Sequence, residues 1–442
     1  MMMKTTLFAA ALALWCTAAT AQPTAREELR ANKFLAGGNY VDYDRQYNAD
    51  APTVRQLTKA PKGYKPYYMS HYGRHGSRWL IGRDDYMRVI RPMRKARQQN
   101  KLTREGEETL RRLELFNKTT HNRLGDLSTV GERQHHGIGR RLTQNFPEIF
   151  KKRGVTVDAR STVVNRCILS MVAECEELMA ANPTMRIHND VSDSLQFYLN
   201  QPWDGLVKKY GGSARAERDA FHAKHTHPER LCQQLFNDQQ WAADSIEAGR
   251  FMRHLFEIAI NMQSHDVDID LLHLFNDDEI YDQWRLRNAD WYVDYGPSPL
   301  SGGIMPFSQR NLLRNIIETA DTTTLTQATM RFGHEVCVMP LACLMELDSC
   351  GVAVEKLDDV EYHWRNYRIF PMACNIQLIF YKPKKQKTPN VDDVLVKALL
   401  NEREVSLPVA TDQFPYYRWK DVRRYWLNKL DSYTAREQRE LK

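Results

Sequence analysis

The hydrophobic positions of the chain follow a strand period and a helix period in turn. Alternating, aromatic-rich or β-branched runs predict strands over four segments: 65–72, 155–160, 325–332 and 372–381. Apolar residues at helical spacing predict helices between them over three others: 129–146, which stops before Pro147, 168–181, and 335–347. The capping-box spacing of Thr129 and Glu132 marks the start of the first of these helices. Strand, loop and helix therefore recur on both sides of the middle of the chain.

The middle of the chain has a different pattern. Residues 185–300 are rich in Trp, His, Asn and Asp, and contain helix-like patches such as AGRFMRHLFEIAINM but no clear strand alternation. This pattern predicts an α/β core, formed by residues 22–170 and 301–442, that is interrupted by an inserted, mainly α-helical domain over 171–300.

The first 21 residues predict a secretory signal. A lone Lys4 precedes an apolar run over 7–15, and the small-residue pattern Ala19-Thr20-Ala21 stands before Gln22. Trp15 is too large to precede a lipoprotein cleavage site at Cys16. No other stretch is apolar over the roughly 18 residues that a membrane span needs. We therefore expect an exported protein, periplasmic or secreted, without a membrane span.

The composition is that of an ordinary globular protein. The chain has 442 residues, of which 42% are hydrophobic and 26% charged, with a formal net charge of +7. These values exclude disordered and collagen-like classes. The basic excess is spread along the chain without a clustered basic and aromatic motif, which favours a small anionic substrate over nucleic acid. Without Cys16, seven of the eight cysteines remain, and an odd number leaves at least one thiol unpaired.

The segment Arg74-His75-Gly76-Ser77-Arg78 follows the first predicted strand. A guanidinium group presents a planar fork of donors that suits phosphate oxygens, and an imidazole can attack phosphorus as a nucleophile. Glycine at position 76 is expected to let the backbone come close to a bound ligand. The segment therefore predicts a phosphate-binding loop with a histidine nucleophile.

Three other segments fall where the ligands of open α/β sheets gather. The first leads from Arg160 to Arg166, near the start of a predicted helix where exposed amides favour anions. The second is Gly333-His334-Glu335, after another strand, and the third is 125–127, before the helix that carries Gln134.

Together these segments predict a two-step phosphoryl transfer. Three arginines, Arg74, Arg78 and Arg166, would bind the phosphoryl oxygens while His75 attacks phosphorus. Glu335 would protonate the leaving alcohol and then deprotonate the water that releases phosphate. A general acid must be protonated at the working pH, which predicts an acidic optimum, and no metal or cofactor is required.

With these motifs in view, the sequence resembles the branch 2 histidine phosphatases, which include the histidine acid phosphatases and phytases, and in particular the multiple inositol-polyphosphate phosphatases. Arg74, His75 and Arg78 match the family's RHGxR motif, Arg166 resembles its third phosphate-binding arginine, and His334 the histidine of its second motif. The resemblance implies a three-layer α/β/α sandwich with an inserted helical domain, a phosphohistidine intermediate, and an inositol polyphosphate such as phytate as substrate. Arg160 is expected to be structural.

The second motif departs from the family pattern. Acid phosphatases and phytases usually have Asp directly after the histidine, and the inositol-polyphosphate group has His-Ala-Glu, whereas this chain has His334-Glu335-Val336. Two alternatives therefore stay open: a broad-specificity or sugar-phosphate acid phosphatase on the same scaffold, and a phosphate-ligand binding protein whose catalysis is impaired.

Two segments partly match metal-binding motifs. Val338 stands where a zinc-protease HExxH motif needs its second histidine. The histidine tract at 222, 225 and 227 lacks neighbouring cysteines or a cluster of carboxylates in the sequence, which favours a solvated loop over a metal site.

Overall fold

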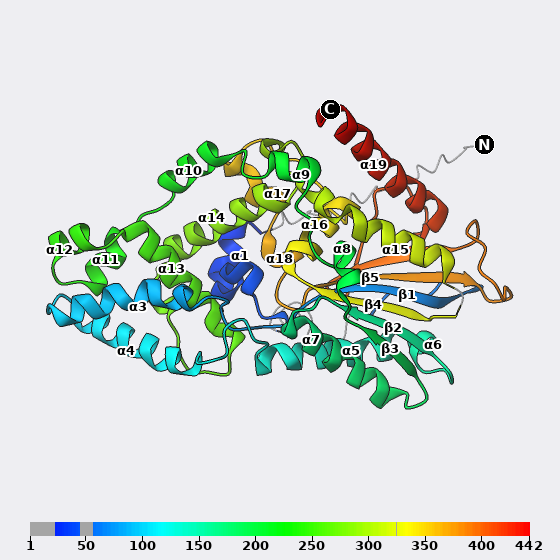
Figure 1. Cartoon of the computed structure of the whole chain (residues 1–442), viewed down its shortest axis with the longest axis horizontal. Helices are drawn as coiled ribbons and strands as arrows, with labels where there is room; N and C mark the ends of the chain where they lie inside the picture. Colours follow the sequence, from blue (N-terminus) through cyan, green and yellow to red (C-terminus); the bar gives the residue numbers. More distant parts are fainter. Residues whose placement is uncertain (1–22, 45–55, 324) are drawn as a thin grey trace, which may run out of the picture.

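A mixed eight-stranded sheet forms the centre of the computed structural model, which describes residues 23–44, 56–323 and 325–442 (Figure 1). Along the sheet the strands follow the order β3-β2-β4-β1-β5-β6-β7, with β8 paired to β6. Their bounds are β1 Tyr64–Arg74, β2 Thr156–Ser161, β3 Arg186–Asp190, β4 Ala328–Gly333, β5 Asn375–Pro383, β6 Leu395–Leu400, β7 Arg403–Val405 and β8 Tyr417–Arg418. The four strands from β3 to β1 are parallel, and β5, β6, β7 and β8 are antiparallel to their partners.

Helices cover both faces of the sheet, so the predicted three-layer α/β/α sandwich is confirmed. Successive side chains of a strand point to opposite faces. On β1, Tyr68 and Tyr72 belong to the hydrophobic core on one face, and Met69 belongs to the core on the other. The first face is covered by α15 Arg310–Thr322, α16 Glu335–Met345 and α19 Trp419–Glu440, and the second by α5 Thr129–Asn145, α6 Pro147–Phe150 and α7 Asn165–Ala181.

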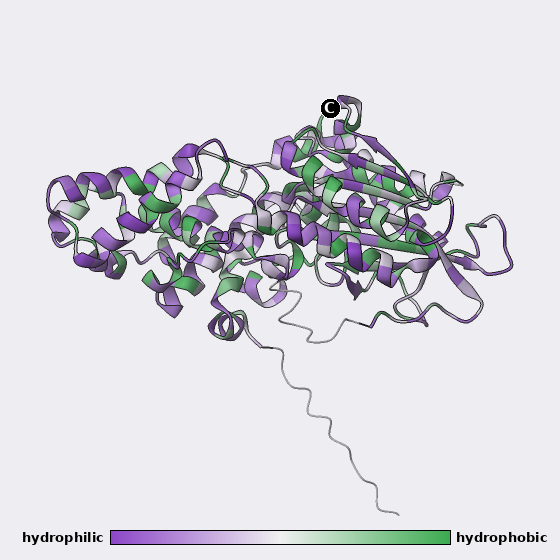
Figure 2. Cartoon of the chain, turned by 90° about the horizontal axis from the view of Figure 1, so that it is seen from below, coloured by the Kyte–Doolittle hydropathy of each residue, from purple (hydrophilic) through white to green (hydrophobic). Residues whose placement is uncertain are grey.

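A second, helical part extends from one end of the sheet (Figure 1). Its core joins helices that are distant in the sequence, since residues 80–116 pack with residues 231–284 in one hydrophobic cluster. Most of its helices carry both hydrophilic and hydrophobic residues, as Figure 2 shows. The helices of this part are α3 Arg83–Gln98, α4 Arg104–Thr119, α10 Arg215–Lys224, α11 Glu229–Leu235, α12 Gln239–Ser245, α13 Ala248–Asn261 and α14 Asp277–Tyr295. Helix α9 Gly205–Tyr210 packs instead with Met305 and with Tyr433 of α19.

The helical part differs in its bounds from the insertion expected over 171–300. Residue 171 lies inside α7, which packs on the sheet, and residues 186–190, where no strand was expected, form β3 and pair with β2. β3 is an edge strand with most of its side chains at least partly exposed, so its sequence lacks the alternation that a half-buried strand shows. The helical part also includes α3 and α4, because an amphipathic pattern does not say which layer a helix covers.

The predicted strands and helices of the core are otherwise confirmed, with ends shifted by a few residues. Helix α5 has Ser128 as its N-cap, one residue before the expected Thr129, because the Ser128 hydroxyl accepts from the Gly131 N–H. Pro340 lies inside α16, and the Val336 carbonyl that it leaves unpaired accepts from Gln309 Nε2 at 3.4 Å. The predicted signal, residues 1–21, lies outside the described residues. Within the described ranges, no helix is both long and apolar enough to cross a membrane.

Candidate active site

Three chain segments meet at one edge of the sheet because their strands are parallel neighbours. The register pairs Arg74 of β1 with Gly333 of β4, and Ser161 of β2 with Phe332. The residues that follow each strand are therefore adjacent, and the His75 N–H donates to the Gly333 carbonyl at 2.9 Å. This edge lies at the carboxyl ends of the parallel strands, where α/β folds bind their ligands.

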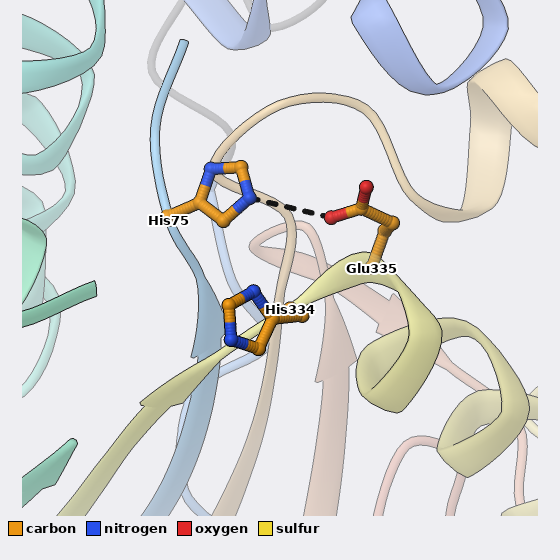
Figure 3. A group of neighbouring side chains, drawn as sticks. All are labelled: His75, His334 and Glu335. Atoms are coloured by element: carbon orange, nitrogen blue, oxygen red, sulfur yellow. Dashed lines mark ion pairs between the residues drawn. The ribbon is translucent and has the colours of Figure 1, made fainter. Parts of the chain in front are cut away.

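The His75 side chain is buried with a defined tautomer. Its Nδ1 lies 2.8 Å from the Gly76 carbonyl oxygen, which can only accept, so Nδ1 carries the proton. Burial lowers the pKa of His75 well below its usual range, and the charges of Arg74 and Arg166 add to this effect although Glu335 opposes it. Neutral His75 therefore presents an Nε2 lone pair, which points toward Glu335 in Figure 3. The distance from Nε2 to Glu335 Oε2 is 3.3 Å.

The loop that carries His75 is fixed against α5 and α7. A Cβ atom at Gly76 would lie 2.4 Å from the Gly131 carbonyl oxygen, so glycine permits the close contact with the α5 backbone. The expected approach of this backbone to a bound ligand stays a prediction. The Gly76 N–H donates to Ser170 Oγ at 3.1 Å, and the Ser77 N–H donates to Gln134 Oε1 at 2.9 Å. These contacts position His75 without using its Nε2 atom.

Arg74 is fully buried and fixed mainly by backbone carbonyl groups. Its Nη1 donates to the carbonyl oxygens of Asn39 at 2.5 Å, Phe370 at 3.2 Å and Pro371 at 3.1 Å. Its Nε donates to Glu335 Oε2 at 3.1 Å. The side chain is therefore oriented before any substrate arrives.

Arg78 and Arg166 complete the positive side of the site. Arg78 Nη1 donates to the Trp79 carbonyl at 2.9 Å, and its Nη2 lies 3.8 Å from Glu335 Oε1. Arg166 is the second residue of α7, and its Nη1 donates to the Gly125 carbonyl at 3.3 Å. Across the described parts of the chain, Arg74 Nη2, Arg78 Nε and Arg166 Nε are buried without a hydrogen-bond partner. Unsatisfied buried donors are costly, and an anion would satisfy them.

His334 and Glu335 come from the junction of β4 and α16. His334 is the N-cap of α16, and its ring centroid lies 5.7 Å from that of His75. Burial lowers the pKa of His334 to about 4, so its ring is neutral near pH 7, and Thr162 Oγ1 lies 3.3 Å from its Nε2. Burial alone would raise the pKa of Glu335, but the charges of Arg74 and Arg78 outweigh it and hold the pKa well below its usual range.

The donor atoms of His75, His334 and Glu335 all lie within 4.8 Å of one another, a spacing that a metal ion can bridge. The positive charges beside these donor atoms oppose a divalent cation. Arg74 and Arg78 already contact the Glu335 carboxylate, and Arg166 interacts with it electrostatically. The site therefore favours an anion over a metal.

The structure brings together the six residues that the sequence singled out: Arg74, His75, Arg78, Arg166, His334 and Glu335. The predicted roles of these residues in catalysis stay predictions. Arg160 lies outside the site, paired with Asp158 and donating to Tyr198 Oη, as expected of a structural residue.

Sequence reasoning missed the groups that hold these residues in place. The carbonyl groups of Asn39, Phe370 and Pro371 fix Arg74, and Ser170 binds the nucleophile loop. A backbone carbonyl acts through its position alone, so no residue type marks it in a sequence.

Two histidines of the tract in the helical part each contact a separate carboxylate. His222 Nε2 lies 3.0 Å from Asp290, and His225 Nε2 lies 3.2 Å from Asp358. The tract therefore has carboxylate neighbours in space that the sequence did not reveal.

The fold is that of the histidine acid phosphatases, as the resemblance implied. The structure is similar to that of the multiple inositol polyphosphate phosphatase of Bifidobacterium longum in complex with inositol hexasulfate, with a TM-score of 0.70 and 19% sequence identity over 89% of this chain and 97% of that chain. It is similar to the phytase of D. castellii, with a TM-score of 0.63 and 13% identity over 90% and 85% of the two chains. For the phytase of Citrobacter braakii the TM-score is 0.54, with 11% identity over 83% and 98%. No protein-family model and no curated protein matches the sequence.

Proposed function

We propose that the protein is a phosphomonoesterase that forms a phosphohistidine on His75. The observation that carries this proposal is the set of three buried guanidinium nitrogens without partners, on Arg74, Arg78 and Arg166, beside an Nε2 lone pair whose tautomer Gly76 fixes. A phosphoryl group supplies acceptors for these donors and an electrophile for that lone pair.

In the proposed first step, His75 Nε2 attacks phosphorus in line, an N–P bond forms and the P–O bond to the alcohol breaks. Glu335 in its protonated form gives its proton to the leaving oxygen. In the second step the Glu335 carboxylate takes a proton from water, the water oxygen attacks phosphorus, and the N–P bond breaks to release phosphate and neutral His75. The arginines stabilise the charge on the phosphoryl oxygens in both steps.

The proposed substrate is an inositol polyphosphate such as phytate. Two of the similar structures are a multiple inositol polyphosphate phosphatase bound to inositol hexasulfate and a phytase. A broad-specificity or sugar-phosphate acid phosphatase on the same scaffold is the alternative, and rates on phytate, p-nitrophenyl phosphate and a sugar phosphate would separate them.

Phosphate release with chelator present, over an acidic to neutral pH series, tests the proposal. We expect His75→Ala to lower kcat by more than about 10³-fold and Glu335→Gln by roughly 10²- to 10⁴-fold. His188→Ala, on an exposed histidine of β3, is the matched control and should leave the rate unchanged.

A wild-type protein that binds phosphate esters but releases no phosphate would identify the binding-protein alternative. Full activity of His75→Ala would contradict the phosphohistidine.

We also propose that the protein is exported and that residues 1–21 are removed. The support is the apolar run and the small residues before Gln22. N-terminal sequencing of the protein from its native cells should begin at Gln22, and a chain that keeps Met1 would contradict export through this segment.

A further inference from the structure

The carboxylate of Glu335 lies among the groups assigned to the phosphoryl group. Its Oε2 accepts from Arg74 Nε at 3.1 Å and lies 3.3 Å from His75 Nε2, and its Oε1 lies 3.8 Å from Arg78 Nη2. Figure 3 shows this carboxylate pointing from the start of α16 at the imidazole. A carboxylate and a phosphoryl group use the same planar donors of arginine.

We propose that Glu335 is an internal ligand of the phosphate site, which the phosphoryl group of the substrate must displace from Arg74, Arg78 and His75. This inference rests on the proposed function. It gives Glu335 a second role as a competitor for the site in which it also acts as proton donor.

The Glu335 carboxylate and a phosphoryl group cannot occupy the site at the same time. A reactive geometry places phosphorus about 3–3.5 Å from the attacking nitrogen, and Glu335 Oε2 already lies at that distance from His75 Nε2. Two anions on the same guanidinium groups also repel each other in a buried site. Displacement therefore exchanges one anion for another at Arg74 and Arg78.

The contact with His75 does not itself hold the carboxylate. With the proton of neutral His75 on Nδ1, the facing atoms Nε2 and Oε2 are both acceptors, so the arginines must hold Glu335 in place. Glu335 is the first residue of α16, and its side chain is 13% exposed, in contrast to the fully buried His75. Rotation about its own side-chain bonds is therefore sufficient to release it, with the helix unmoved.

Release changes the proton affinity of Glu335. While the carboxylate contacts the arginines, they hold its pKa well below the usual range. When a phosphoryl group takes those donors, burial and the negative charge of the phosphoryl group remain, and both raise the pKa. Binding of the substrate thus converts Glu335 from a carboxylate into the proton donor that the first step needs, with the proton taken from acidic solvent.

The titratable and charged groups around Glu335 come from every element packed against it. They are Tyr40 of η1 (Lys33–Tyr40), Arg74 of β1, His75 and Arg78 of the loop after β1, Arg166 and Cys167 of α7, Tyr295 of α14, His334 before α16, Cys337 of α16 and Cys374 before β5. The arginines are the only cations in this set at neutral pH, because burial lowers the pKa values of both histidines.

Calorimetric titration with sulfate at about pH 7 tests the inference. Sulfate is a tetrahedral dianion that is not hydrolysed, so it measures occupation of the site without turnover. We expect Glu335→Gln and Glu335→Ala to bind sulfate at least about tenfold more tightly than the wild type, although both variants turn over substrate more slowly. The difference should shrink toward pH 4, because bound sulfate raises the pKa of Glu335, so that proton uptake by the displaced carboxylate favours sulfate binding to the wild type at acidic pH.

The control removes a charge at the other end of the same helix. Glu346 is the C-cap of α16 and pairs with Lys429, and Glu346→Gln should leave sulfate affinity unchanged. Melting temperatures verify that each variant folds.

A folded Glu335→Ala variant that binds sulfate no more tightly than the wild type would overturn the inference. If Glu335→Ala does not fold, the same criterion applies to Glu335→Gln: sulfate binding no tighter than in the wild type would overturn the inference. These readouts separate the two proposals: tighter binding in the variants of a protein without phosphatase activity would refute only the proposed function, and unchanged binding in an active enzyme would refute only the internal ligand.

Discussion

Two facing glycines set the position of the loop that carries His75. Gly76 and Gly131 allow the loop after β1 to lie against the backbone of α5, since a Cβ at Gly131 would lie 2.3 Å from the Ser77 carbonyl oxygen. Neither atom of this contact belongs to a flexible side chain, so a methyl group at either position must move the loop or the helix.

We predict that Gly76→Ala lowers the free energy of unfolding by about 2 kcal/mol and kcat by more than tenfold, because the loop that carries His75 must shift. Chemical denaturation and phosphate-release kinetics measure the two effects. The matched control is Gly137→Ala on α5, the helix that contains Gly131. There a Cβ would meet only the flexible end of Arg141, and alanine stabilises a helix by about 1 kcal/mol relative to glycine. Equal behaviour of the two variants would contradict the role of the close contact.

At the residue scale, the reactive side chains were predictable from the sequence, and the groups that hold them in place were not. The RHGSR segment predicted the buried histidine and its arginines, because their chemistry depends on residue type. The contact between Glu335 and the arginines did not follow from the motif. It depends on the side-chain rotamer of Glu335, which the sequence does not specify. The contact of Gly76 with α5 did not follow from the sequence either, because the identity of a glycine does not say which neighbour approaches it.

At the scale of elements, the parallel strands explain why the site was predictable. Arg74 and Gly333 are register partners, so two motifs separated by more than 250 residues in the sequence end side by side. Helix α14 was predictable only as part of a helical region. Its contact with η1 depends on tertiary packing, which hydrophobic periodicity does not encode.

A fourth arginine, Arg287 of α14, lies beside the three predicted phosphate-binding arginines. Arg287 Nη2 donates to Asn39 Oδ1 at 3.0 Å, while the carbonyl oxygen of the same Asn39 accepts from Arg74. The guanidinium groups of Arg287 and Arg78 lie over the Tyr40 ring, at 5.4 Å and 5.5 Å from its centroid. Arg287 therefore extends the positive row from the nucleophile toward the helical part.

We predict that Arg287→Gln raises KM for phytate about tenfold and leaves KM for p-nitrophenyl phosphate unchanged. A second phosphate of a polyphosphorylated ring would lose one charge-assisted hydrogen bond, whereas a monoester has no group at this position. Steady-state kinetics on both substrates decides the point, with Arg314→Gln, at an exposed position of α15, as control. An equal change for the two substrates would show that Arg287 supports the fold and not substrate choice.

At the scale of the whole molecule, the stability of the part that the structure describes rests on its hydrophobic core and not on disulfide bonds. Among the described residues, all seven cysteines are unpaired and buried. Burial raises the pKa values of Cys167, Cys337 and Cys343 to about 12, so these thiols are neither charged nor accessible at neutral pH.

We predict that a reducing agent leaves the melting temperature unchanged, because the described residues contain no bond for it to break. A colorimetric thiol reagent should react with no cysteine of the folded mature protein and with seven after denaturation. Fewer than seven thiols in the denatured protein, or a lower melting temperature under reduction, would reveal a disulfide.

The hydrogen bonds of Arg74 carry a consequence for biosynthesis. One carbonyl that fixes this arginine belongs to Asn39, 35 residues away, and the other two belong to Phe370 and Pro371, nearly 300 residues further along the chain. The ribosome synthesises His75 early. Two of the carbonyl groups that orient the neighbouring Arg74, those of Phe370 and Pro371, emerge only when most of the polypeptide exists. An unfinished or truncated chain therefore holds His75 without a fully oriented site, and we expect the proposed hydrolytic activity to begin only once translation is nearly complete.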